Sequence, residues 1–318
     1  MNREEQTIKR KSWSIGEMIR YLREKQQISL GCLSRGLCSM STLSRIENNE
    51  RALSILLAQR LLGRLGWKIC EFESYCSDKE FDWYERRIEI QELKKQKDLI
   101  QMKNMLEQYE AETRSKQRDH LQEQFLMKEK AFFMIEEEKY EEAVLLIKEA
   151  ISLTVTGWEE TGISLLGFEE IELFCMLADV YERLQERESA YPIWEQLLHY
   201  LENRKVNKRQ IAEPYTYVIS RIVPYILACK MARKGAELCE KGIQTASDTL
   251  NLNFCCELLY WKAKCIKQLY QYGKVEKSEL IQSYRFAYYV CSSFGKMELA
   301  QEIQEYLKGE AKDGYLSD

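Results

Sequence analysis

The chain has 318 residues, of which 45% are hydrophobic and 31% are charged. This composition supplies enough apolar side chains for a folded core and excludes a wholly disordered chain, and the length fits two domains. With three prolines and 14 glycines, the sequence is too poor in turn residues for a β-sandwich or β-barrel, so an all-α fold is expected.

The formal net charge of −4 is unevenly distributed along the chain. Residues 1–66 hold 12 Lys and Arg against 6 Asp and Glu, whereas residues 67–318 hold 35 against 45. The N-terminal segment therefore carries a net charge of +6 and the remainder −10. This asymmetry indicates that the N-terminal segment binds a polyanion and that the rest of the chain does not.

The residues expected for metal, redox or catalytic sites are scattered. The 11 cysteines include no Cys-x-x-Cys pair, and the two histidines, His120 and His199, are isolated. The odd cysteine count and the lack of a secretory segment favour reduced thiols in a cytoplasmic protein, and no apolar stretch is long enough to span a membrane. We expect no cofactor, no metal and, without a nucleophile elbow or a phosphate-binding glycine loop, no enzymatic activity.

Four short helices are predicted between residues 14 and 66, because four serines each precede an apolar pattern of helical spacing. A serine at this position can cap a helix by accepting a hydrogen bond from its first turn. Gly66 is expected to end the fourth helix in a left-handed conformation. The predicted caps are Ser14, Ser29, Ser39 and Ser54.

The third of these helices, from Met40 to Asn48, turns only Leu43 and Ile46 inward and leaves small hydroxylic side chains and Arg45 outward. Small side chains allow a close approach to a DNA groove, and arginine can form two hydrogen bonds with guanine. A recognition helix in a helix-turn-helix domain has this arrangement, and the helix before it rests on the phosphate backbone. A four-helix bundle with a solvated polar face is the alternative. The predicted DNA contacts are Ser29, Arg35, Ser39, Met40, Ser41, Thr42, Arg45, Asn48 and Arg51, with Lys9, Arg10 and Lys11 as phosphate or minor-groove contacts.

The segment from Leu33 to Asn49, LSRGLCSMSTLSRIENN, resembles the Xre-type helix-turn-helix of the lambda-repressor class. It is most similar to the variant found in the peptide-responsive PlcR/Rgg/NprR/PrgX regulators, which reads L-S-x-x-I-C-x-x-S-x-x-S-R-I-E-x-G. Asn49 stands where that pattern has glycine, and asparagine tolerates the left-handed conformation. Glu47 is expected to pair with Arg20 or Arg23 and to have no chemical role.

Residues 1–70 are thus predicted to form the DNA-binding domain, 71–80 a linker and 81–318 a second domain of helical repeats. At its start, residues 78–123 carry 10 basic and 12 acidic residues. They form either a long solvated connecting helix or a degenerate first helical pair. The spacing of apolar residues favours the pair. These residues are Phe81, Tyr84 and Ile88, then Leu99, Met102, Leu106 and Tyr109.

A clearer repeat pattern follows. The segment from Tyr140 to Leu153 resembles the second helix of a tetratricopeptide repeat, because Ala143 and Ala150 allow neighbouring helices to approach closely. Equivalent positions recur at separations of 41 to 47 residues, longer than the standard unit of about 34. The resemblance to the same regulators implies a right-handed solenoid of lengthened repeats. The equivalent positions are Met102, Ala143, Ala190, Gly235 and Leu280.

Stacked helical pairs present a concave surface that suits an extended peptide. The helical register directs several cations and aromatic rings into it, which would suit a short peptide with an apolar body and a free carboxylate. For the aromatic residues Trp194, Trp261 and Tyr181, core packing is the alternative interpretation. The predicted peptide contacts are Phe132, Asp179, Arg183, Tyr217, Arg221, Tyr260, Lys264 and Lys267.

The resemblance implies a cytoplasmic transcription regulator that binds a double-stranded DNA operator as a homodimer. Its repeats would dimerise and sense a short signalling peptide, as in quorum sensing, and the peptide would shift the two DNA-binding domains relative to each other. One alternative keeps the DNA-binding domain but makes the repeats a ligand-independent scaffold for oligomerisation or protein docking. Another, a hydrolase or phosphatase modulator, has no catalytic motif in its favour.

Overall fold

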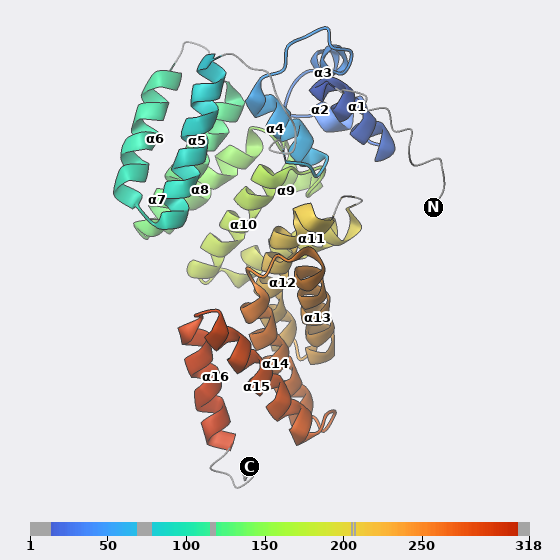
Figure 1. Cartoon of the computed structure of the whole chain (residues 1–318), viewed down its shortest axis with the longest axis vertical. Coiled ribbons are helices and arrows are strands. Elements are labelled where there is room, and N and C mark those ends of the chain that lie inside the picture. The colour runs from blue at the N-terminus through green and yellow to red at the C-terminus, as the bar shows by residue number, and fades with distance from the viewer. Residues whose placement is uncertain (1–13, 69–77, 115–118, 205, 207, 311–318) are drawn as a thin grey trace, which may run out of the picture. The chain divides into compact units, whose positions relative to one another are not determined.

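The computed structural model describes residues 14–68, 78–114, 119–204, 206 and 208–310 (Figure 1). All regular secondary structure within these ranges is helical, which confirms the expected all-α class. The chain divides into two compact units, Met1–Gln185 and Glu186–Asp318. This division lies inside the segment predicted to form the repeat domain, so each unit is described separately.

The first unit begins with the four predicted helices, and each has the predicted serine at its N-cap. Ser14 forms a capping box with Glu17, in which the Glu17 amide donates to Ser14 Oγ at 3.1 Å. Gly66 has a φ of +78°, which confirms its predicted role as a left-handed terminator. The four helices are α1 (Ile15–Lys25), α2 (Leu30–Ser34), α3 (Met40–Glu47) and α4 (Ile55–Arg64).

The core of these helices is formed by the apolar residues whose spacing predicted them. Ile19, Leu33, Leu43 and Leu61 are fully buried in a single cluster with the other inward leucines. Ile46, the other residue predicted to face inward on α3, is also buried. Local periodicity was therefore sufficient to identify which face of each short helix is apolar.

Gly16 sets how closely α1 approaches α3. A Cβ atom at this position would lie 2.1 Å from the carbonyl oxygen of Ile46, which is backbone and cannot move aside cheaply. We expect Gly16→Ala to lower the free energy of unfolding by about 3 kcal/mol, because it forces the two helices apart. Chemical denaturation measures the change. Gly309→Ala is the matched control, since its Cβ meets no atom within 4 Å, and it should leave stability unchanged or slightly raised. A Gly16→Ala protein as stable as the control would contradict this packing.

The segment after the linker forms two helices, which confirms a first helical pair and excludes a single connecting helix. The chain reverses between them at Lys97, which has a φ of +60°. The predicted linker 71–80 lies outside the described residues, except for its last three positions, which belong to α5. The two helices are α5 (Asp78–Gln96) and α6 (Leu99–Thr113), side by side in Figure 1.

The apolar residues of α5 do not share one buried face. Phe81 and Ile88 are 46% and 43% exposed, whereas Ile90 and Arg87 are buried. Because charged residues occupy most of this helix, its apolar pattern is too weak to select one face, and contacts with other helices decide which side is buried.

In the rest of the first unit, α8 packs against both α7 and α10. Ala143 and Ala150 are fully buried on α8, as the repeat pattern predicted, and Ile147 is buried beside them. The small side chains let α8 lie close to both α7 and α10. These helices are α7 (His120–Glu136), α8 (Tyr140–Ser152), the single turn α9 (Trp158–Thr161) and α10 (Phe168–Arg183).

The second unit consists of helices that pack on their chain neighbours. On α13, Gly235 and Gly242 face the next helix so closely that an added Cβ would lie 2.8 Å from Cys265 Sγ and from Leu258 Cδ1 respectively. The positions predicted to be equivalent between repeats are all buried. The helices are α11 (Arg187–Asn203), α12 (Lys208–Ala228), α13 (Ala232–Thr249), α14 (Cys255–Gln271), α15 (Lys277–Ser293) and α16 (Met297–Glu310).

Candidate nucleic-acid interface

The outer side of α3 is open to solvent. Met40 is 61% exposed, Ser41 and Arg45 are exposed, and Thr42 is half-buried. The other residues predicted to contact DNA are also exposed: Ser29, Arg35, Ser39, Asn48 and Arg51. Lys9, Arg10 and Lys11 lie outside the described residues. The predicted set is thus available to a ligand on one part of the first unit.

Hydrogen bonds draw several of these side chains together at the start of α3. Ser39 caps the helix by accepting from the Thr42 amide at 3.0 Å, and its hydroxyl also lies 2.9 Å from that of Ser41. Arg51, from the loop after α3, donates to Thr42 Oγ1 at 3.1 Å. The N-terminal turn of α3 therefore presents small hydroxyl groups beside a guanidinium, while Arg45 projects one turn further along.

Glu47 holds α3 against α1. Both of its carboxylate oxygens accept from Arg23, at 2.7 and 2.8 Å, and both side chains are largely buried. The hydrogen bond with Glu47 is the main cause that raises the pKa of Arg23. The expected structural role of Glu47 is confirmed, with Arg23 as its partner. Arg20 instead pairs with Glu24 at 3.1 Å.

Sequence reasoning missed one potential DNA contact. Arg20 also donates to Asn48 Oδ1 at 3.3 Å, so its exposed guanidinium lies at the end of α3. The sequence predicts Arg20 only as a possible partner for Glu47. Its position four residues before Glu24 on α1 gave no indication of this contact, which depends on how α1 crosses α3.

The turn between α2 and α3 packs against residues of the repeat segment on the side opposite the exposed face of α3. Gly36 has a φ of +72°, and an added Cβ would lie 2.0 Å from the Thr154 carbonyl oxygen. The Gly36 carbonyl accepts from His120 Nε2 at 2.9 Å. Arg64 donates to the carbonyls of Leu33, at 3.1 Å, and Arg35. Backbone atoms of the turn therefore face the repeats, while the outer side of α3 faces solvent.

Arg64 connects the helix-turn-helix domain to the repeats through a buried ion pair. Its Nη2 lies 2.9 Å from Glu170 Oε1 and donates to the Thr154 carbonyl at 3.1 Å. The side chains of Arg64 and Glu170 are 2% and 0% exposed. Arg60 and Arg64 interrupt an otherwise apolar helix, and this was the only sequence signal for the contact.

His120 supplies a pH-dependent contribution to stability. Its Nδ1 lies 3.3 Å from Asp119 Oδ1, and this hydrogen bond is the main cause that raises the pKa of His120 above its ordinary value. A raised folded-state pKa means that the stabilisation is complete below the unfolded-state pKa of about 6.5 and is lost as the pH rises through the folded-state pKa. We therefore expect a titration midpoint above about 6.5 in an NMR titration of the imidazole.

The second histidine allows the signals to be assigned, because His199→Gln leaves only His120 to titrate. In denaturant unfolding, the stability lost in His120→Gln should be larger at about pH 5.5 than at about pH 8.5. The difference should be small, since the side chain is 41% exposed and solvent screens the pair. A midpoint at or below about 6.5 would contradict the contact.

The predicted peptide contacts of the first unit lie on α7 and α10. Phe132 is half-buried, with Lys94 Nζ 4.4 Å from its ring centre. Asp179 is half-buried, and Arg183 is exposed and lies over the ring of Tyr140 at 5.7 Å. These three residues are thus reachable from solvent to different degrees.

The predicted peptide contacts of the second unit lie on α12 and α14. Most of them already pack against or pair with other side chains of the unit. Tyr217 packs against Trp194 and Phe254, and Arg221 is half-buried. Tyr260 is only 7% exposed, and its hydroxyl donates to Glu302. Lys264 pairs with Glu302 at 2.7 Å, and Lys267 lies over the ring of Tyr306. Whether they contact a peptide remains a prediction.

Neither a metal site nor a membrane segment is present in the parts of the chain that the structure describes. No group of three or more His, Cys, Asp or Glu residues among them is arranged to hold a metal ion. None of the described helices combines the length and apolar character needed to cross a bilayer. The nine cysteines within the described ranges are all free thiols, and five of them are buried.

The sequence matches no protein-family profile and no curated protein. Its structure is similar to PlcR of Bacillus thuringiensis in complex with the peptide PapR7 and DNA, with 18% identity over 92% of this chain and 99% of PlcR, and a TM-score of 0.54. The apo form of PlcR gives 16% identity, 92% and 98% coverage, and a TM-score of 0.55. The SHP pheromone receptor Rgg2 of Streptococcus dysgalactiae has 20% identity over 93% of this chain and 100% of Rgg2, with a TM-score of 0.44. The PlcR comparisons confirm the expected resemblance at the level of the fold.

Proposed function

We propose that this chain is a transcription regulator that binds double-stranded DNA through α3. The observation that carries the proposal is the exposed N-terminal turn of α3, where small hydroxyl groups adjoin Arg45 and Arg51 on a helix-turn-helix with a basic sequence. The fold supports it, because PlcR, which shares this fold, has been solved in complex with DNA. In this proposal residues 1–70 are the DNA-binding domain, and the repeats begin with α5 at Asp78.

The repeats, in this proposal, bind a short signalling peptide and form the interface of a homodimer in the cytoplasm. On α12 and α14 of the second unit, the half-exposed side chains of Tyr217, Arg221 and Lys267 support a ligand with an apolar body and a carboxylate. PlcR was solved with the peptide PapR7, which supports a peptide as the ligand. Peptide binding changes DNA binding only if the two arrangements of the dimer differ in peptide affinity.

Selection from a random duplex library with the full-length protein tests DNA binding. We expect an enriched motif with two half-sites, separated by about one helical turn of roughly 34 Å or a multiple of it. Binding of the selected duplex should weaken steeply with salt, as phosphate contacts require. A library with no enriched sequence after repeated selection would overturn the proposal.

Peptide sensing is tested separately against the scaffold alternative. Short synthetic peptides encoded beside the gene for this chain would be titrated calorimetrically into the full-length protein. Saturable binding that changes the affinity for the selected duplex supports a sensor. Binding of none of them, together with a constitutive dimer, would favour the ligand-independent scaffold.

A further inference from the structure

A cavity of about 510 Å³ lies between α4 of the helix-turn-helix domain and α5, α7 and α10 of the repeats, all within the first unit. Its volume is in the range of pockets that hold small organic ligands. Aromatic side chains line much of it, and polar groups converge between them. The aromatic residues are Trp67, Tyr84, Phe125 and Phe168.

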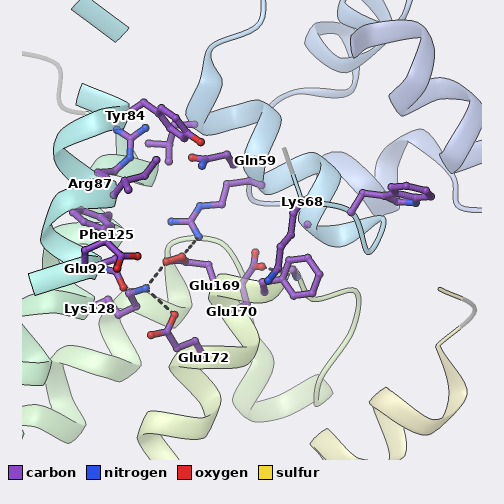
Figure 2. A pocket seen from close by; sticks show the side chains of 18 of the residues that line it. Gln59, Lys68, Tyr84, Arg87, Glu92, Phe125, Lys128, Glu169, Glu170 and Glu172 are labelled. Carbon is purple, nitrogen blue, oxygen red and sulfur yellow. Dashed lines mark hydrogen bonds and ion pairs between the residues drawn. The ribbon is translucent and has the colours of Figure 1, made fainter. Parts of the chain in front are cut away.

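The carboxylates on the wall of this cavity already have cationic partners. Figure 2 shows Glu169 and Glu172 joined by dashed lines to cations on one side, with Glu172 2.8 Å from Lys128 Nζ. Each carboxylate is therefore neutralised by its own cationic partner, and none is left to neutralise another cation of the wall. The four pairs are Glu92–Lys95, Glu169–Arg60, Glu170–Arg64 and Glu172–Lys128.

Arg87 lacks such a partner. It is 7% exposed, and its Nη1 donates to the neutral hydroxyl of Tyr109 at 3.0 Å. Among the described residues, no carboxylate oxygen lies within 4.0 Å of its guanidinium. A buried guanidinium without a counter-charge is unfavourable, and Arg87 is the one buried cation of the wall that has no carboxylate partner among the described residues. Lys68 also lines the cavity, but it is exposed to solvent and lies over the ring of Phe168 at 5.8 Å.

Arg60 adds a second incompletely paired group. It is 5% exposed and binds Glu169 through Nη1 at 2.9 Å, but its buried Nε has no hydrogen-bond partner. Burial lowers the pKa of Arg60 to about 10, and the nearby charge of Arg87 adds to the shift. Gln59, Tyr84 and Arg87 line the same cavity, and Figure 2 shows all three away from Glu172. The lining of the cavity therefore includes hydrogen-bond donors of Arg60 and Arg87 that lack a carboxylate acceptor.

We propose that this cavity binds a small monocarboxylate with an aromatic or other apolar body, whose carboxylate is held by Arg87 and Arg60. A guanidinium fork matches a carboxylate by two parallel hydrogen bonds, and the aromatic wall buries the apolar body. One negative charge balances Arg87, whereas the second charge of a dianion would find no further unpaired cation among the buried residues of the wall. The inference does not depend on the proposed DNA binding or on the predicted peptide contacts.

The ligand bound in this way would contact two parts of the first unit together. Arg60 and Gln59 belong to α4, the last helix of the DNA-binding domain, whereas Arg87 belongs to α5, the first repeat helix. Binding therefore stabilises the contact between these helices by mass action.

The test compares 3-phenylpropionate with its neutral amide, 3-phenylpropanamide, in calorimetric titrations of the full-length protein. The two probes have the same apolar body and differ in charge. We expect the carboxylate to bind with a Kd on the order of 1 mM and the amide at least about tenfold more weakly. Equal affinity for both probes, or binding of neither, would overturn the proposal.

Variants locate the site. Arg87→Gln removes the cation without a carboxylate partner, and Gln59→Glu adds a carboxylate to the lining of the same cavity, so each should weaken 3-phenylpropionate binding at least about tenfold. The matched control is Arg86→Gln, on the neighbouring residue, whose ion pair with Glu112 is partly exposed. It should bind as the unmodified protein does.

Circular dichroism and melting temperature show whether each variant is folded. Undiminished binding in a folded Arg87→Gln protein would overturn the assignment. If Arg87→Gln does not fold, Gln59→Glu decides, because Gln59 is half-buried, makes no described hydrogen bond and lines this cavity. Full affinity in folded Gln59→Glu would then refute the site.

Discussion

Replacing Arg45 by glutamate should reduce the affinity for the selected operator duplex by at least about 100-fold. Arginine that binds guanine by two hydrogen bonds contributes about 1–3 kcal/mol to discrimination, and the added carboxylate also faces the negative field of the phosphates. Arg45 is exposed on α3, so the change leaves the packing of the helix intact. Fluorescence anisotropy with a labelled duplex measures the affinity.

Arg233→Glu is the control for net charge, since Arg233 is an exposed arginine on α13 in the second unit. It makes the same change of charge and should reduce affinity only slightly, with a loss that disappears at high salt. If folded Arg45→Glu bound the operator as tightly as this control, α3 would not be the recognition helix. The DNA-binding proposal would then need another surface.

Replacing Arg64 by alanine should lower the free energy of unfolding by about 3–5 kcal/mol. The change leaves Glu170 charged and fully buried without its partner, and it removes the donor from the carbonyls of Leu33, Arg35 and Thr154. Because Glu170 would remain buried and away from water, the stability lost is far larger than that lost when an exposed ion pair is broken. Denaturant unfolding followed by circular dichroism measures it.

Two further variants separate the ion pair from general packing. Arg20→Ala breaks a pair whose side chains are 53% and 54% exposed, and it should cost less than about 1 kcal/mol. The double variant Arg64→Met, Glu170→Leu should recover part of the stability lost in Arg64→Ala, because no buried charge is left without a partner. A double variant less stable than Arg64→Ala would show that Arg64 acts mainly through its contacts with the turn.

The helix-turn-helix domain could be predicted well because its signals are local. Each of the four serines lies directly before the helix that it caps, and Asn49 adopts the predicted left-handed φ of +60° within its own turn. The buried alanines of α8 were also predictable, since small residues at helical spacing indicate a close helix contact. Such patterns require no knowledge of distant parts of the chain.

The buried charges could not be predicted, because their partners are remote in sequence. Arg64 and Glu170 are 106 residues apart, and Arg87 and Tyr109 lie on different helices. On α5, the structure buries Arg87 and Ile90 and leaves Phe81 and Ile88 exposed, although Phe81 and Ile88 belong to the apolar spacing that predicts the helix. A charged residue within an apolar helical pattern indicates that burying its side chain would be unfavourable. It does not indicate which distant residue would pair with that charge in the folded protein.

The amino-acid sequence by itself determined the all-α class, the limits of the first four helices and the side of α3 that is open to solvent. Those features depend on capping and on apolar periodicity, which act over a few residues. Only the tertiary structure decided that Arg64 anchors the turn before α3 and that Arg60 and Arg87 share one cavity. Ion pairing and desolvation depend on distances in space, and these are set by the packing of helices far apart in the chain.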